Sequence, residues 1–126
     1  MKRDMDFVRD ILLGIEELDD GVGCNYTDLR FYFKKKGFSD DDKLYGHCEI
    51  MAQSDLIEFS TRRVAGGKWV QERPIKLLWE GHDFLDAVRD QGVWEKVKKT
   101  SSTIGSATFE IIKTIAIETA KGHIGY

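Results

Sequence analysis

The 126-residue chain has a single proline, only two cysteines and no long apolar run. Without about 18 consecutive apolar residues, it offers no candidate transmembrane span. Its first residues lead into a charged amphipathic helix and lack the continuous apolar core of a signal peptide. Cys24 and Cys48 have no C-x-x-C spacing, so we expect two free thiols in a reducing compartment. These absences predict a cytoplasmic protein that does not bind a membrane.

Patterns typical of enzymes and metal sites are also missing. Zinc sites need about four ligands at a recognisable spacing, and the three histidines provide none. His47, Cys48 and Glu49 are consecutive on a predicted helix, so they point in different directions and cannot all bind one ion. Gly66-Gly67 lacks the strand and length of a phosphate-binding loop. We therefore expect no catalytic residue, no metal, no cofactor and no enzymatic activity.

Charge is distributed unevenly along the chain. The net charge of −3 and the pI near 5.6 give no global attraction to nucleic acid. Residues 27–37 nevertheless carry four basic groups against one acidic group, and residues 56–78 carry five against two. Residues 38–55 have the opposite balance, with one basic group against five acidic groups. Positive and negative charge therefore alternate by segment.

Helical periodicity predicts three helices in the first half of the chain, over residues 3–19, 27–37 and 39–55. Thr27 is a natural N-cap for the second helix. Ser39 and Asp42 have the spacing of a capping box, which predicts the start of the third. Residues 56–79 then alternate as two strands around Gly66-Gly67, and Pro74 suits an edge.

The second half of the chain is predicted to be helical. Residues 80–91 form a fourth helix, and a further helical turn follows around residues 93–97. Residues 100–103, all serine or threonine, are predicted to be a short polar linker. A last helix runs from Ser106 to about Lys121.

This order of elements predicts an α+β, mostly helical fold. A helix followed at once by an antiparallel hairpin is the second half of a winged helix-turn-helix domain. We therefore predict a winged helix-turn-helix with a two-stranded wing and additional C-terminal helices. Residues 1–100 would form this domain. Residues 101–126 would be a helical extension, either packed on the same domain or used to form a homodimer.

Three blocks of sequence resemble one bacterial and prophage family, the domain of unknown function 2513. The blocks are Met1–Leu12, His47–Ile57 and Leu78–Ala87, the last followed by Val93-Trp94. The resemblance implies a winged-helix-like fold and a phage or mobile-element setting, and it assigns no activity. The chain departs from the family at Gly46, where the family has an aromatic residue, and at Asp55, where it has glycine.

One hypothesis for function is a DNA-binding transcriptional regulator. Cations on a projecting wing can contact phosphates, and an aromatic side chain can stack or wedge beside them. On the third helix, Lys43 and Gln53 are residue types that read guanine and adenine, and His47, Glu49 and Ile50 share their face. The nucleic-acid candidates are Lys43, Gln53, Arg62, Arg63, Lys68, Trp69 and Arg73. The alternative for the wing cations is that they only protect a sheet edge from pairing.

The acids of the third helix favour a different partner. They repel a phosphate backbone, so an ordinary helix cap or a protein-binding surface explains them better than base reading. In this alternative, a host or phage protein binds the acidic helix, whose charge imitates that of DNA. The residues of this partner surface would be Asp40, Asp41, Asp42, Glu49 and Ile50.

Overall fold

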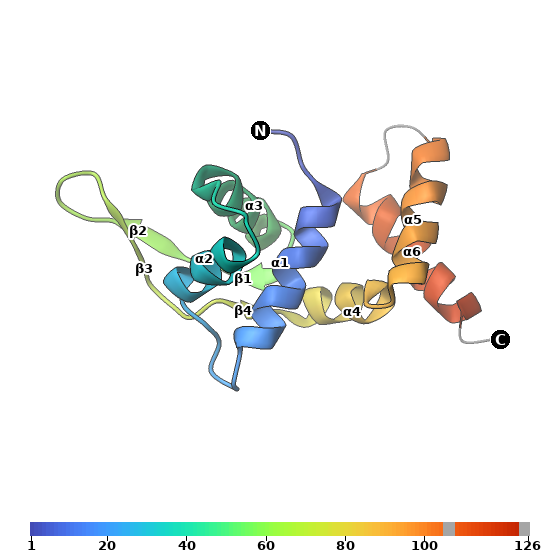
Figure 1. The fold of residues 1–126 in the computed structure, drawn as a ribbon, viewed down its shortest axis with the longest axis horizontal. Coiled ribbons are helices and arrows are strands. Elements are labelled where there is room, and N and C mark those ends of the chain that lie inside the picture. The colour runs from blue at the N-terminus through green and yellow to red at the C-terminus, as the bar shows by residue number, and fades with distance from the viewer. Residues whose placement is uncertain (105–107, 124–126) are drawn as a thin grey trace. The chain divides into compact units, whose positions relative to one another are not determined.

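The computed structural model describes residues 1–104 and 108–123. The described residues form an α+β, mostly helical fold with six helices and four short strands (Figure 1). The chain divides into two compact units, Met1–Gly81 and His82–Tyr126. The domain boundary predicted at residue 100 falls inside a continuous helix, Gln91–Ile104.

The first unit begins with three helices: α1 (Met5–Leu18), α2 (Tyr26–Lys35) and α3 (Asp41–Gln53). All three were predicted, but two of the caps were wrong. Asn25, not Thr27, caps α2, because its side-chain oxygen accepts the Asp28 N–H. Asp40, not Ser39, caps α3 by accepting the Lys43 N–H at 3.1 Å. The predicted capping box at Ser39 is therefore absent, and each helix begins where an Asx oxygen reaches the third backbone N–H.

The core of the first unit lies where the apolar faces of these helices meet. Ile11, Leu12 and Ile15 of α1, Leu29 of α2 and Leu44 of α3 are all fully or almost fully buried. Buried residues recur at helical spacing within each helix, with Phe33 four positions after Leu29 and Cys48 four positions after Leu44, as the apolar stripes predicted.

Both α2 and α3 end in the same hydrogen-bonded turn. After α2, the Phe38 N–H donates to the Phe33 carbonyl and Gly37 adopts a φ of 87°. After α3, the Leu56 N–H donates to the Met51 carbonyl and Asp55 adopts a φ of 58°. Each is a Schellman motif, which places one residue in the left-handed region.

A two-stranded ribbon follows α3 and extends away from the three helices (Figure 1). Its inner part pairs β1 (Ile57–Glu58) with β4 (Lys76–Leu77), and its outer part pairs β2 (Thr61–Arg63) with β3 (Trp69–Gln71). The predicted hairpin with Gly66-Gly67 near its tip is confirmed, since both glycines have positive φ there. The second predicted strand was too long, because Trp79 begins a helix and is 80% exposed.

Helix α4 (Trp79–Val88) begins in the first unit and continues into the second. Gly81, the last residue of the first unit, lies so close to Leu56 of the same unit that a Cβ there would overlap the Leu56 carbonyl oxygen. In the second unit, α5 (Gln91–Ile104) packs against α6 (Phe109–His123), and Phe84 contacts the rings of Trp94 and Phe109.

The structure contradicts one prediction about the second unit and does not describe the residue on which another depends. The polar linker predicted at residues 100–103 is wrong, because α5 runs through it and the Ser101 and Ser102 hydroxyls donate to helix carbonyls. Ser106, the predicted start of the last helix, lies outside the described residues. None of the described helices has the length and apolar character needed to cross a membrane.

Candidate nucleic-acid interface

His47, at the centre of α3, is completely buried and uses both ring nitrogens. Nε2 accepts the backbone N–H of Asp4 at 3.0 Å, and Nδ1 lies 2.8 Å from the Lys43 carbonyl oxygen. The Asp4 bond requires an unprotonated Nε2, so the proton is on Nδ1, which donates to the carbonyl. The ring also lies edge-on to Phe7 at 5.1 Å. His47 joins α3 to the start of α1, so the prediction that it faces DNA is wrong.

Lys43 is also directed toward the protein. Its ammonium lies 2.9 Å from the Asp4 carboxylate and over the rings of Phe7 and Phe38, at 5.2 and 5.8 Å. Its hydrogen bond is the main reason why the pKa of Asp4 lies below its usual value. The Asp4 carboxylate also accepts the Phe7 N–H and so caps α1. The sequence placed Lys43 among base-reading candidates, but here it holds two helices together.

The remaining outward face of α3 is acidic. Asp42, Glu49 and Gln53 are exposed, while Ile50 is only partly exposed. Asp41 pairs with Arg30 of α2 through two hydrogen bonds of 2.8 and 3.1 Å. Gln53 is thus the one predicted base-reading residue that α3 presents to solvent.

The first residue of the chain lies against the same helix. A Cβ added to Gly46 would come within 2.7 Å of the Met1 sulfur. The absence of a side chain at Gly46 leaves room for the Met1 side chain.

Four aromatic rings attach the ribbon to the helices. Trp69 of β3 packs on Tyr45 of α3 at 4.6 Å and on Tyr26 of α2 at 5.1 Å. Phe59, between β1 and β2, closes the group at 5.9 Å from Tyr26. The Tyr45 hydroxyl shares a hydrogen bond of 3.2 Å with the Thr61 hydroxyl. Trp69 therefore has a structural role, and its stacking on a base stays a prediction.

Sequence reasoning did not single out Tyr45 as part of this group. The sequence feature that could have indicated Tyr45 is its position at the border between the buried and the exposed face of α3. Leu44 and Cys48 on the buried face flank it, and an aromatic residue at such a border can cover a neighbouring strand.

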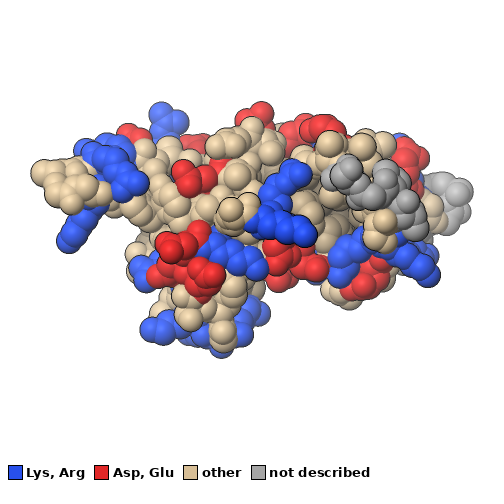
Figure 2. Space-filling model, turned by 90° about the horizontal axis from the view of Figure 1, so that it is seen from above, with Lys and Arg blue, Asp and Glu red and all other residues tan. Residues whose placement is uncertain are grey.

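Three predicted cations lie together on the outer ribbon. Arg62 and Lys68 are exposed, and the exposed Arg63 donates to the Gly67 carbonyl at 2.7 Å across the hairpin loop. Residues 59–71 contain these three cations and no acidic residue. In Figure 2, Lys and Arg surface lies at the projecting end of the ribbon, whereas basic and acidic surface is interleaved over the helices. We call Arg62, Arg63 and Lys68 the ribbon cations.

Arg73, the remaining predicted cation, and the lysines of α2 do not belong to this group. Arg73 lies toward the base of the ribbon and approaches Glu58 at 3.5 Å. On α2 and at its C-cap, Lys35 and Lys36 lie over the rings of Phe31 and Tyr32, at 4.8 and 4.9 Å. These two lysines are therefore held on the rings of their own helix.

The two cysteines are free, as the spacing predicted, and both are buried. Burial raises the pKa of Cys24 to about 11 and that of Cys48 to about 12. Both thiols are therefore protonated at neutral pH and are poor nucleophiles. Within the described part of the chain, no three His, Cys, Asp or Glu side chains lie together as a metal-binding group.

These features define a helical α+β protein with a basic ribbon and an acidic helix. The chain belongs to the family described as "Hypothetical protein (DUF2513)", whose model matches residues 2–107. It is similar to an "Uncharacterized protein" of Haemophilus influenzae, with 29% identity over 119 residues that cover 92% of each chain. No solved structure matches the chain.

Proposed function

We propose that this protein is a non-enzymatic winged-helix protein that binds double-stranded DNA through its ribbon. The observation that supports this proposal is the exposure of Arg62, Arg63 and Lys68 on a projecting hairpin that has no acidic residue between Phe59 and Gln71. Flexible cations on such an element can contact phosphates on both sides of a groove.

In this proposal α3 does not enter the major groove. Its only lysine is engaged by Asp4, and its exposed charges are acidic. Binding therefore depends mainly on phosphate contacts made by the ribbon. The resemblance to a prophage family makes a transcriptional regulator of a mobile element the role we propose.

The test is a fluorescence anisotropy titration with random-sequence duplex over a series of salt concentrations. We compare the wild type with the triple variant Arg62→Gln, Arg63→Gln, Lys68→Gln. Loss of three phosphate contacts should flatten the slope of log K against log salt by about 3. The matched control is Lys34→Gln, Lys35→Gln, Lys36→Gln, which removes the same charge from another surface. Absence of binding by the wild type at low salt, or equal losses in both variants, would overturn the proposal.

A second candidate function is the binding of a basic protein by the acidic face of α3. The pairing of Lys43 with Asp4 favours this function, because it directs the only cation of α3 toward α1. The exposed charges of the helix are then Asp42, Glu49 and Asp41, the last of which pairs with Arg30. A small acidic protein of this kind could occupy a nucleic-acid-binding surface by imitating the charge of DNA.

A fluorescent oligo-arginine peptide serves as the probe for this second function. If α3 is the binding face, Asp42→Asn with Glu49→Gln should weaken peptide binding about tenfold, and the ribbon triple variant should not. The same double variant should strengthen duplex binding if the ribbon binds DNA, because it removes repulsion. Equal peptide affinity of the wild type and the α3 double variant would exclude the acidic face.

A further inference from the structure

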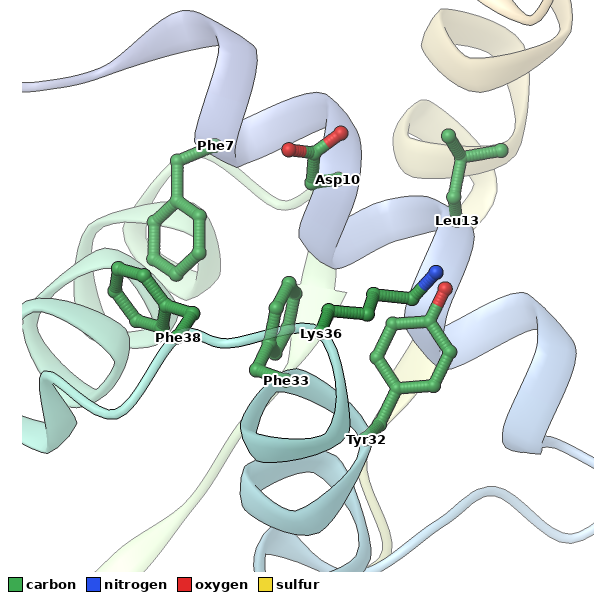
Figure 3. A pocket seen from close by; sticks show the side chains of 7 residues that line it. All are labelled: Phe7, Asp10, Leu13, Tyr32, Phe33, Lys36 and Phe38. Atoms are coloured by element: carbon green, nitrogen blue, oxygen red, sulfur yellow. The ribbon is translucent and has the colours of Figure 1, made fainter.

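Helices α1 and α2 enclose a hollow of about 380 Å³ (Figure 3). Three phenylalanines form one wall, since Phe7 lies 5.2 Å from Phe33 and 4.6 Å from Phe38. Tyr32 and Leu13 continue the lining toward the other end of the hollow. Such an aromatic wall can take an apolar group of a small ligand.

Two opposite charges lie on the two sides of this hollow. Asp10 comes from α1, and Lys36 is the C-cap residue of α2. Among the described residues no ion pair of 4 Å or less joins them, although Arg9 and Lys36 both lie close enough to act on Asp10 electrostatically and oppose the rise of its pKa. Burial of Asp10 against the helix surface raises its pKa, so this carboxylate is partly removed from water. The Lys36 ammonium lies over the Tyr32 ring at 4.9 Å.

A ligand with one charge would satisfy only one of these side chains. A cation would pair with Asp10 and leave Lys36 without a carboxylate, and an anion would do the reverse. A molecule that carries an ammonium, a carboxylate and an apolar group would satisfy both charges and also cover the phenylalanine wall.

We propose that this hollow binds a free α-amino acid with an apolar or aromatic side chain. The ammonium of the ligand pairs with Asp10, its carboxylate pairs with Lys36, and its side chain packs on Phe33 and Phe38. Because Phe7 contacts both the hollow and His47, the ligand lies one ring away from the junction of α1 with α3. Binding stabilises the folded state by an amount that grows with the logarithm of ligand concentration once that concentration exceeds Kd.

The test is isothermal titration calorimetry with four probes on the full chain. L-phenylalanine and L-leucine carry both charges, phenylacetate lacks the ammonium, and phenethylamine lacks the carboxylate. We expect at least one of the amino acids to bind, and both singly charged probes to bind at least about tenfold more weakly.

Variants locate the site. Asp10→Asn and Lys36→Met should each weaken amino-acid binding by at least about tenfold, because each removes one of two charge-assisted contacts. The matched controls, Asp20→Asn and Lys35→Met, change the same residue types outside the hollow and should leave affinity unchanged.

Three results would overturn the proposal. The first is no heat of binding and no rise in melting temperature with either amino acid. The second is phenylacetate or phenethylamine binding as tightly as L-phenylalanine, which would show a site for a single charge. The third is equal affinity of the wild type, Asp10→Asn and Lys36→Met, which would place the ligand elsewhere.

Discussion

Helix α3 and the ribbon are consecutive in the chain, yet they orient their side chains in opposite ways. Helix α3 turns its histidine and lysine toward α1 and presents acids to solvent. The ribbon turns Trp69 toward the helices and presents three cations to solvent. The type of a residue therefore does not determine whether its side chain packs inside the protein or is exposed to solvent. That depends on which residues the tertiary structure places next to it.

The comparison also distinguishes basic residues that are paired within the protein from basic residues that are exposed to solvent. Lys43 has a carboxylate and two aromatic rings within reach, so it loses little by leaving water. Arg62 and Lys68 lie in a segment without acids, so water or an external anion must solvate them.

The internal role of α3 is tested most strongly by His47→Ala. The change removes a fully buried ring and leaves the Asp4 N–H without its partner, so it should lower the free energy of unfolding by about 3 kcal/mol. Urea denaturation measures this loss. His82→Ala, at an exposed histidine, is the control and should change stability by less than about 0.5 kcal/mol. Equal effects of the two changes would contradict the inward role of His47.

The attachment of the ribbon is tested by Trp69→Ala. Trp69 is half-buried against Tyr26 and Tyr45, so its removal should cost about 2 kcal/mol. Trp79→Ala removes an equal ring that is 80% exposed and should cost less than about 0.5 kcal/mol. Thermal and urea unfolding compare the two variants, and a larger loss from Trp79 would show that the ribbon is not held by this cluster.

The turn between α3 and the ribbon is tested by Asp55→Gly. Asp55 has a φ of 58°, a conformation that glycine adopts without a steric penalty. The substitution should therefore raise the free energy of unfolding by about 0.5 to 1 kcal/mol. Gly37→Ala at the equivalent position after α2, where φ is 87°, should lower it by about 1 kcal/mol. A loss of stability in Asp55→Gly would mean that the carboxylate itself is needed there.

The ion pair between α1 and α3 is tested by pH. The pKa of Asp4 is below its usual 3.8 in the folded protein, chiefly because Lys43 donates to its carboxylate. Its contribution is therefore complete above about pH 3.8 and is lost as pH falls through the lower folded pKa. Since both side chains are about a third exposed, we expect less than about 0.5 kcal/mol.

Asp4→Asn keeps a capping oxygen and removes the charge, so it isolates this contribution. The wild type should be slightly more stable than Asp4→Asn at neutral pH, and the difference should vanish in acid. A difference that persists or grows below pH 3 would contradict the assignment.

Much of the fold was predictable from short stretches of sequence. The stripes of α1 and α3, the hairpin around Gly66-Gly67 and the absence of a disulfide between the two cysteines all follow from local periodicity and spacing. The caps were missed by one or two residues, because several side chains near each helix start can serve as a cap. The helix at residues 100–103 was mistaken for a linker, because serine and threonine side chains are typical of loops but can also bond to helix carbonyls.

The candidate site was less predictable. The sequence located the ribbon cations, because a charge pattern on a hairpin is local. It could not show that Lys43 and His47 are used internally, since both bond to Asp4, 39 and 43 positions away in the chain. It could not show the hollow between α1 and α2 either, because its charges come from separate helices.

Sequence patterns alone thus establish the order of helices and strands, the hairpin and the segments of positive and negative charge. Each depends on residues within a few positions of one another. Tertiary structure decided which charges face outward, which ring holds the ribbon and where α1 and α2 leave a hollow. Those outcomes depend on contacts between distant residues, and a helix turned by about 100°, the angle between consecutive residues, would bring Asp42 inward in place of Lys43.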